Sequence, residues 1–140
     1  MSLVVDTGVL YAQHDSDASR HESAQAAMEA VARGKYGRPS ITEHIYDETV
    51  TLTQARTGRH SAARLVGEQL RERDLFRLLV TERALFEAAV DVFERYDDHG
   101  LSFTDATTIA LVEERDIDHV LSFDDDFDGI VDRLDPREVS

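Results

Sequence analysis

Short apolar runs alternate with longer segments of helical periodicity along the chain. Leu3-Val4-Val5 is a continuous apolar run that ends at Asp6, a pattern typical of a strand buried on both faces. Further strands are predicted over residues 75–80 and 119–122, with an edge strand over 130–134. Helices are predicted between them, over residues 19–33, 41–57, 60–73, 82–97 and 103–115. This alternation predicts an α/β domain with a mainly parallel central sheet.

Glycines and capping residues set the predicted helix ends. Gly58 is expected to end the helix over 41–57, because glycine readily adopts the left-handed conformation found after a helix. Pro39-Ser40 is expected to open that helix, with Ser40 and Glu43 at the spacing of a capping box. Thr81 is expected to cap the helix that follows it.

The length of 140 residues is that of one domain, so residues 1–140 are expected to form a single domain. No cysteine is present, which excludes a disulfide framework, a cysteine nucleophile and a thiolate zinc site. No apolar run reaches the roughly 20 residues of a membrane span, and the first residues lack the pattern of a signal peptide. A soluble cytoplasmic protein is therefore expected.

The net charge is strongly negative, because 15 basic residues minus 29 acidic residues gives −14. Such a surface repels phosphates, so charge alone argues against sequence-independent binding of RNA or DNA. At molar salt, however, the Debye length is about 3 Å and this repulsion is largely screened. Abundant Asp and Glu beside a single lysine resemble the composition of proteins from salt-loving organisms. We therefore interpret the charge as a sign of habitat rather than of function.

Asp6 directly follows the first predicted strand. In parallel sheets the ligand crevice lies beyond the carboxyl ends of the strands, so Asp6 is a candidate site residue. A carboxylate at the edge of the core is costly to bury unless it is paired or bound to a metal ion. The structural alternative is an N-cap for a helix that begins near Gly8.

Glu48 lies within the helix predicted over 41–57. It is expected to share a helical stripe with apolar residues and so to point away from water. These residues are Ile41, Ile45, Leu52 and Ala55. A glutamate buried in mid-helix is unusual without a partner, which makes Glu48 a second candidate. Its neighbour Asp47 projects to another side and is expected to be solvated.

Asp105 opens the helix predicted over 103–115 and admits two interpretations. Ser102 and Asp105 have the spacing of a capping box, which is a structural role. The apolar residues that share its stripe turn the Asp105 side chain toward the protein, which favours a functional role. The residues alone leave both interpretations open.

Four aspartates follow the strand predicted over 119–122. They are Asp124, Asp125, Asp126 and Asp128. Such a run is usually a solvated loop. The calcium-loop pattern does not fit, because Gly129 comes directly after Asp128 and no Glu follows at the required distance. Since the run begins at the carboxyl end of a strand, at least one of its carboxylates is expected to reach the crevice.

Three or four carboxylates in one pocket destabilise a protein unless cations neutralise them. Oxygen-only ligands select Mg²⁺ or Mn²⁺ over zinc or copper. Two such ions are a known device for phosphodiester hydrolysis. The residues therefore allow a metal-dependent nuclease without requiring one.

Four motifs in order resemble those of the PIN-domain nucleases, and most closely the VapC-type toxins of toxin–antitoxin pairs. The resemblance extends over essentially the whole chain, and four motifs in order are more specific than any one of them. The motifs are Val4-Val5-Asp6-Thr7, Asp47–Leu52, Ser102–Ala106 and Leu121–Phe127.

The resemblance implies a PIN-like, three-layer α/β/α fold with a central, mainly parallel sheet of four to five strands. It also implies Mg²⁺- or Mn²⁺-dependent hydrolysis of RNA that leaves a 5′-phosphate and a 3′-hydroxyl. Carried over by motif, the catalytic and metal-binding carboxylates are Asp6, Glu48, Asp105 and Asp124, with Asp126 as an additional metal ligand. Thr7 and Ser122 would orient carboxylates through their hydroxyls. Gly8 stands where many relatives have Ser or Asn, and Ser122 replaces the usual Thr, but neither departure removes a ligand.

Partners follow from the same resemblance. It implies an RNA substrate, a homodimer and a small cognate antitoxin whose tail places an Arg or Lys over the acidic pocket. The segment from Arg56 to Arg77 is rich in arginine. It is either an ordinary surface balanced by nearby acids or a rim that contacts phosphates, with Arg56 and Arg59 as candidate RNA contacts. Nothing in the sequence names the RNA that is cleaved.

Two other functions that place an aspartate after the first strand do not fit the sequence. An aspartyl-phosphate phosphatase would need a second Asp two residues after Asp6, where Gly8 stands. A phosphate-acceptor signalling domain would need a lysine late in the chain, whereas the single lysine is Lys35. A housekeeping RNA-processing PIN nuclease and a non-catalytic PIN-like binding module remain as alternatives. Retention of all four carboxylates favours catalysis, and the small size favours the toxin.

Overall fold

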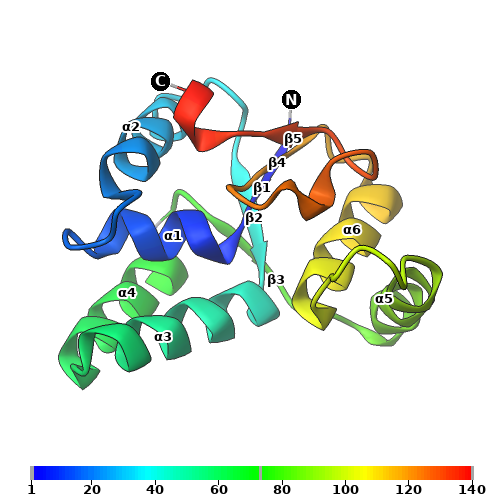
Figure 1. Cartoon of the computed structure of the whole chain (residues 1–140), viewed down its shortest axis with the longest axis horizontal. Helices are drawn as coiled ribbons and strands as arrows, with labels where there is room; N and C mark the ends of the chain where they lie inside the picture. The colour runs from blue at the N-terminus through cyan, green and yellow to red at the C-terminus, as the bar shows by residue number, and fades with distance from the viewer. Residues whose placement is uncertain (1, 73, 140) are drawn as a thin grey trace.

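The computed structural model describes residues 2–72 and 74–139. Within them, the chain forms one sheet of five parallel strands in the order β3-β2-β1-β4-β5 (Figure 1). The strands are β1 (Leu3–Val5), β2 (Pro39–Thr42), β3 (Arg77–Leu79), β4 (His119–Leu121) and β5 (Arg133–Leu134). The predicted parallel sheet of four to five strands is therefore confirmed.

Helices cover both faces of the sheet, as the predicted three-layer α/β/α fold requires. In Figure 1, α1 to α4 lie to the left of the strands and α5 and α6 to the right. The helices are α1 (Thr7–His14), α2 (His21–Ala32), α3 (Glu43–Thr57), α4 (His60–Glu72), α5 (Arg83–Arg95) and α6 (Phe103–Arg115). Two short 3₁₀ turns, η1 (Asp125–Phe127) and η2 (Pro136–Glu138), follow β4 and β5. No described helix is both long enough and apolar enough to cross a membrane.

Two aromatic residues attach the acidic loop after β4 to the core. Phe123 is 7% exposed and Phe127 is completely buried. Burying a phenylalanine side chain stabilises a fold by roughly 1.5–3 kcal/mol. The aspartates between Phe123 and Phe127 therefore lie on a loop whose two ends are anchored by packing.

The start of α3 differs from the prediction. Pro39–Thr42 is the buried strand β2, so the helix begins at Glu43 and not at 41. Ser40 pairs in the sheet and caps no helix, whereas the Thr42 hydroxyl accepts the Ile45 N–H at 3.2 Å. The predicted capping box of Ser40 and Glu43 is therefore wrong.

Glu43 instead connects two elements at the carboxyl edge of the sheet. Its carboxylate accepts hydrogen bonds from the backbone N–H and the hydroxyl of Thr81. Thr81 is therefore not the cap of α5, whose N-cap position is Glu82. Gly58 ends α3 as predicted, with a left-handed φ of 67°. Arg73, the last residue of the helix predicted over 60–73, lies outside the described residues.

Candidate metal centre

The strand order reverses direction at β1, which has β2 on one side and β4 on the other. Such a reversal opens a crevice at the carboxyl ends of the strands. Asp6 follows β1 there, and its backbone N–H donates to the carbonyl of Leu121 at 3.0 Å. This pairing brings Asp6 beside Ser122, although the two residues are far apart in sequence.

Asp6 is a nearly buried carboxylate, only 8% exposed. It occupies the N-cap position of α1 but its side chain makes no capping hydrogen bond. Instead it accepts the Ser122 hydroxyl at 2.6 Å. Burial raises the pKa of Asp6 to about 7, against the lowering effect of the Ser122 hydrogen bond, and the charges of Asp105 and Asp124 raise it further.

Ser122 joins two of the candidate carboxylates. Its fully buried hydroxyl donates to Asp6 and accepts the backbone N–H of Asp124 at 3.0 Å. A serine hydroxyl has one proton and two lone pairs, so it can serve both residues at once. The side chain of Asp6 and the backbone at Asp124 are therefore positioned by the same group.

Glu48 lies on α3 with its side chain half-buried. Its Oε1 accepts the Thr7 hydroxyl at 3.0 Å, and both residues line a hollow of about 440 Å³. The prediction that Glu48 shares a buried apolar stripe with Ile41, Ile45, Leu52 and Ala55 is partly wrong. The buried residues of α3 are Ile45, Thr49 and Thr53, whereas Ile41 belongs to β2 and Ala55 is exposed. Glu48 therefore lies beside the buried stripe, at the wall of the hollow.

Asp105 combines the two roles that the residues left open. Its N–H donates to the Ser102 hydroxyl, and its Oδ2 accepts the Ser102 N–H, each at 3.0 Å, so the capping box is present. Burial raises the pKa of Asp105, and the charges of Asp124 and Glu48 raise it further, although the bonds to Ser102 lower it. The carboxylate thus caps α6 while it lies in the field of two other candidates.

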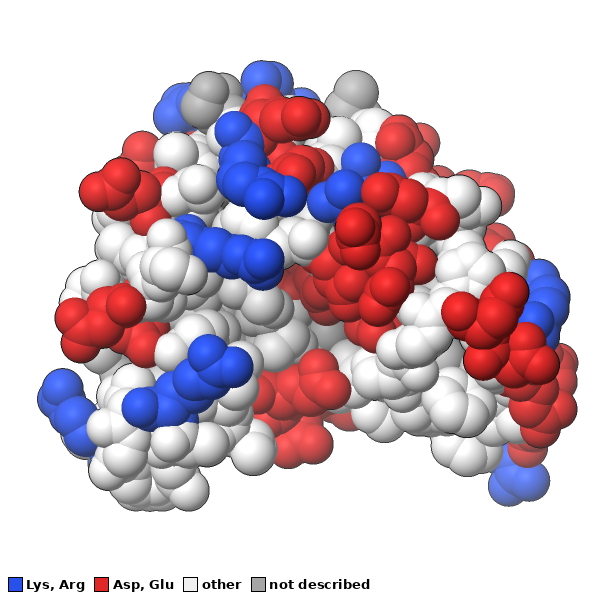
Figure 2. Space-filling view, viewed as in Figure 1, with Lys and Arg blue, Asp and Glu red and all other residues white. Residues whose placement is uncertain are grey.

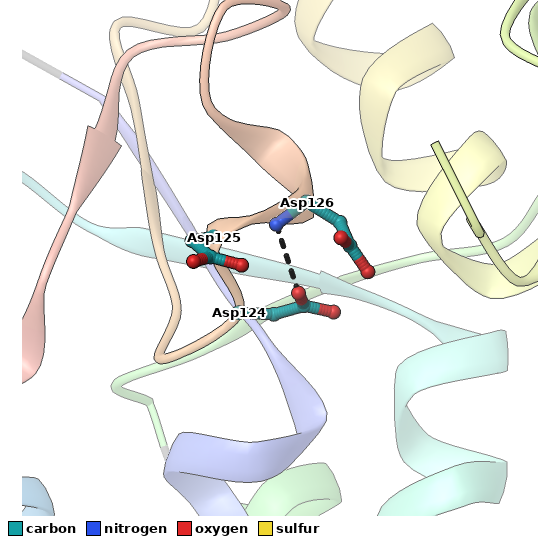
Figure 3. A group of neighbouring side chains, drawn as sticks. All are labelled: Asp124, Asp125 and Asp126. Carbon is teal, nitrogen blue, oxygen red and sulfur yellow. Dashed lines mark hydrogen bonds between the residues drawn. The ribbon is translucent and has the colours of Figure 1, made fainter. Parts of the chain in front are cut away.

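The acidic loop brings three aspartates together (Figure 3). One oxygen each from Asp124, Asp125 and Asp126 lies within 4.8 Å of the others. The Asp126 N–H donates to Asp124 Oδ1 at 2.9 Å, and the charge of Asp124 is the main cause of the raised pKa of Asp126. Asp128 instead pairs with Arg133 at 2.7 Å. The sequence offers no signal that separates Asp125 from its neighbours in the run of aspartates.

The candidate carboxylates therefore form two connected groups. The charges of Asp105 and Asp124 raise the pKa of Asp6, and those of Asp124 and Glu48 raise the pKa of Asp105. Among the described residues, the acidic oxygens that are close enough to share one ion without movement are those of Asp124, Asp125 and Asp126. Figure 2 shows acidic side chains gathered in the hollow between the two helical sides of the molecule.

This donor set fits a hard divalent cation. None of the ion pairs in the described part of the chain involves Asp6, Glu48, Asp105 or Asp124. A nearly buried carboxylate beside further carboxylates, without a basic partner, is stabilised by a bound cation. Carboxylate oxygens favour Mg²⁺ or Mn²⁺. Asp6, Glu48, Asp105 and Asp124 could hold such an ion, with Asp126 at the edge of the group.

Asp6→Asn is expected to stabilise the chelated, metal-free protein increasingly as pH rises from 5 to 8. Because the folded pKa of about 7 exceeds the ordinary 3.8, the folded state binds the extra proton, and its stability falls as pH rises through this window. Asparagine carries no charge at any of these pH values. Thermal unfolding of both proteins in a chelator should show a gain of about 1–2 kcal/mol at pH 8.

The matched control is Asp91→Asn, which changes an exposed carboxylate on α5. Its stability relative to the parent should stay constant across the same pH range. A constant difference for Asp6→Asn as well would mean that the Asp6 carboxylate is not destabilised by burial.

A family model and two proteins of known function are similar in sequence to this chain. The family model described as PIN domain matches residues 3–132. A VapC ribonuclease of Archaeoglobus fulgidus is 28% identical over 128 residues, which cover 91% of this chain and 80% of that protein. The 23S rRNA-specific endonuclease VapC20 of Mycobacterium tuberculosis is also 28% identical over 128 residues, covering 89% of this chain and 91% of that protein.

Solved structures have the same fold. The crystal structure of M. tuberculosis VapC20, a sarcin–ricin loop cleaving toxin, superposes with a TM-score of 0.80 at 28% identity. The match covers 92% of this chain and 96% of that one. A toxin–antitoxin complex from Klebsiella pneumoniae superposes with a TM-score of 0.69 at 17% identity, covering 98% of this chain and 99% of that one. The latter shows likeness of fold alone.

Proposed function

Because this chain belongs to the PIN-domain family, we propose that it is a metal-dependent endoribonuclease that acts as the toxin of a toxin–antitoxin pair. The observation that carries this proposal is the buried Asp6 carboxylate at the carboxyl edge of the sheet, which pairs with no basic side chain among the described residues and lies in the field of Asp105 and Asp124. Relatives that align over most of the chain are named as VapC ribonucleases, which supports the same reaction.

The proposed metal ligands are Asp6, Glu48, Asp105 and Asp124, with Asp126 as an additional ligand. Mg²⁺ or Mn²⁺ bound there would supply the activation of water and the stabilisation of the leaving oxygen in phosphodiester hydrolysis. Hydrolysis in this manner leaves a 5′-phosphate and a 3′-hydroxyl. Asp125 lies close to Asp124 and Asp126 in the acidic loop and is a further candidate ligand, to which the resemblance assigns no role.

The chain's own hydroxyls hold the ligands in place. Ser122 donates to Asp6 and Thr7 donates to Glu48, so each carboxylate has at least one oxygen held in place. The Ser102 N–H restrains Asp105 in the same way. Such outer hydrogen bonds fix the orientation of ligands before substrate arrives, which lowers the reorganisation needed in the reaction.

Mn²⁺ is expected to raise the melting temperature of the protein by about 5–10 °C at saturation, because it binds the folded state alone. Asp105→Asn should lose most of this shift, whereas Asp91→Asn should keep it. The readout is thermal unfolding with and without Mn²⁺. The absence of any shift at high Mn²⁺, together with the absence of RNA cleavage, would favour the non-catalytic binding module.

The proposed substrate is RNA, with Arg56 and Arg59 on the rim of the site. Arg56 lies in the last turns of α3 and Arg59 in the turn before α4, and both are exposed. We propose that the cognate antitoxin covers the carboxylates with a basic side chain and that the toxin is a homodimer. Charge complementarity supports the former, since the carboxylates lack a basic partner in the described part of the chain.

The function is tested by inducing the chain in cells and sequencing the 5′-phosphate ends of cellular RNA. A toxin is expected to arrest growth and to create new ends at a few defined positions, while Asp105→Asn does neither. Cleavage confined to the maturation sites of stable RNA, without growth arrest, would favour a housekeeping processing enzyme. The absence of new ends would contradict a ribonuclease.

A further inference from the structure

Arg20 and Arg56 line the same hollow, which has a volume of about 470 Å³ and includes Gly8 and Tyr11 in its wall. Arg20 directly precedes α2, and Arg56 lies in the last turns of α3. The two cations come from segments far apart in sequence. The fold therefore brings them to one surface beside α1.

Each guanidinium is held over an aromatic ring. The Cζ of Arg20 lies 4.8 Å from the ring centre of Phe123, and the Cζ of Arg56 lies 5.4 Å from that of Tyr11. A guanidinium that stacks through its flat face keeps N–H groups along its edge for other partners. The rings thus orient the two cations without using all of their donors.

This hollow adjoins the candidate metal centre. Phe123, under Arg20, stands between Ser122 and Asp124 in the chain. Leu52 lines both this hollow and the one beside Glu48, and Gly8 directly follows Thr7. A polymer bound across the metal centre can therefore continue past both arginines. Figure 2 shows basic side chains on the same face as the acidic cluster.

Five arginines elsewhere in the described residues form ion pairs with carboxylates. They are Arg64, Arg83, Arg95, Arg133 and Arg137, each with a carboxylate oxygen within 4 Å. No ion pair within residues 2–72 and 74–139 involves Arg20 or Arg56. Asp15 lies in the same hollow, where its carboxylate accepts the Tyr11 hydroxyl and the Asp17 N–H. The Tyr11 hydrogen bond lowers the pKa of Asp15 most, and the charge of Arg56 lowers it further, so Asp15 balances part of the Arg56 charge without a direct ion pair.

We propose that Arg20 and Arg56 bind two backbone phosphates of the RNA strand next to the cleaved linkage, an inference that rests on the ribonuclease function proposed above. With a net charge of −14, most of the molecule repels RNA. Affinity then depends on the few places where guanidinium edges face the path of the strand. Guanidinium forks bind phosphate through paired N–H groups and position the strand without reading its sequence.

The experiment measures binding of a short, mixed-sequence, single-stranded RNA, with Asp105→Asn as the common background to prevent cleavage. Arg20→Gln and Arg56→Gln are compared with Arg33→Gln, which changes an exposed arginine at the opposite end of α2. Each of the first two should weaken binding about tenfold. Each should also reduce the slope of log K against log salt by about 0.7, the value for one lost phosphate contact on a single strand. Arg33→Gln should change neither quantity.

A second readout separates phosphate binding from packing. In the cleavage-competent chain, Arg20→Gln and Arg56→Gln should raise KM with little change in kcat, because a backbone contact is made equally in the ground and transition states. Arg20→Lys and Arg56→Lys should keep most of the salt slope, since the charge remains. Melting temperatures should stay close to that of the parent. A fall in melting temperature with an unchanged salt slope would show that the arginines only pack against the rings, which overturns the inference.

Failure of this inference and failure of the ribonuclease function give different results. If the parent binds and cleaves RNA while both glutamine variants match it in affinity and salt slope, the phosphate contacts are overturned and the function stands. If the parent neither binds nor cleaves RNA, both are overturned.

Discussion

Asp105→Asn is expected to reduce RNA cleavage at least about a thousandfold while the fold remains intact. The amide oxygen of asparagine can still accept the Ser102 N–H, so the cap of α6 survives. The negative charge is lost, and with it one proposed oxygen ligand for the divalent cation. The measurement is the rate of RNA cleavage by purified protein at saturating Mn²⁺, with circular dichroism to verify the fold.

Asp91→Asn is the matched control for this change, because it removes an exposed aspartate from the adjacent helix α5. Its cleavage rate should equal that of the parent. If purified Asp105→Asn cuts RNA as fast as the parent, the assignment of the carboxylates to catalysis is wrong.

Ser122→Ala is expected to lower cleavage about 10–100-fold, the usual effect of removing a hydrogen bond that orients a metal ligand. The change deletes the 2.6 Å bond to Asp6 and leaves the Asp124 N–H without its acceptor. Mn²⁺ affinity should fall in parallel. Ser122→Thr keeps the hydroxyl and should restore both quantities.

A purely structural role for Ser122 predicts another outcome. It would lower the melting temperature of the metal-free protein while cleavage per folded molecule and Mn²⁺ affinity stay unchanged. Ser61→Ala, which removes an exposed hydroxyl from α4, controls for the substitution itself.

The strands that the sequence predicts best are those buried on both faces. Leu3–Val5 is wholly apolar, because neighbours on either side and helices above and below leave no position for a polar side chain. Pro39–Thr42 is equally buried but contains a serine and a threonine, so its pattern resembles a helix start. Its burial comes from pairing with β1 and β3, and no local pattern encodes those contacts.

The sequence predicts the positions of the carboxylates to different extents. Asp6 is identified because it ends a buried strand. Glu48 is identified from an apolar stripe of α3 that is only partly present in the structure. Thr49 and Thr53 can occupy buried positions on α3 because their hydroxyls donate to helix carbonyls at 2.7 Å. A search for apolar residues alone therefore misses the buried face of this helix.

Contacts between segments that are far apart in the chain could not be predicted from the sequence. The Ser122 bond to Asp6 depends on the register of β1 against β4. The approach of Arg20 to Phe123 depends on how α2 lies against the loop after β4. Neither contact produces a periodic pattern in the sequence. The motifs therefore include Ser122, but nothing in the sequence indicates a role for Arg20.

The central claim is that Asp6, Glu48, Asp105 and Asp124 gather around divalent cations. Anomalous diffraction from crystals soaked in Mn²⁺ tests it most directly. We expect manganese peaks at ligand distance from the carboxylate oxygens of these four residues, with Asp6 and Asp124 sharing an ion. Manganese bound solely by the exposed loop of Asp124, Asp125 and Asp126, or no manganese at all, would contradict the claim.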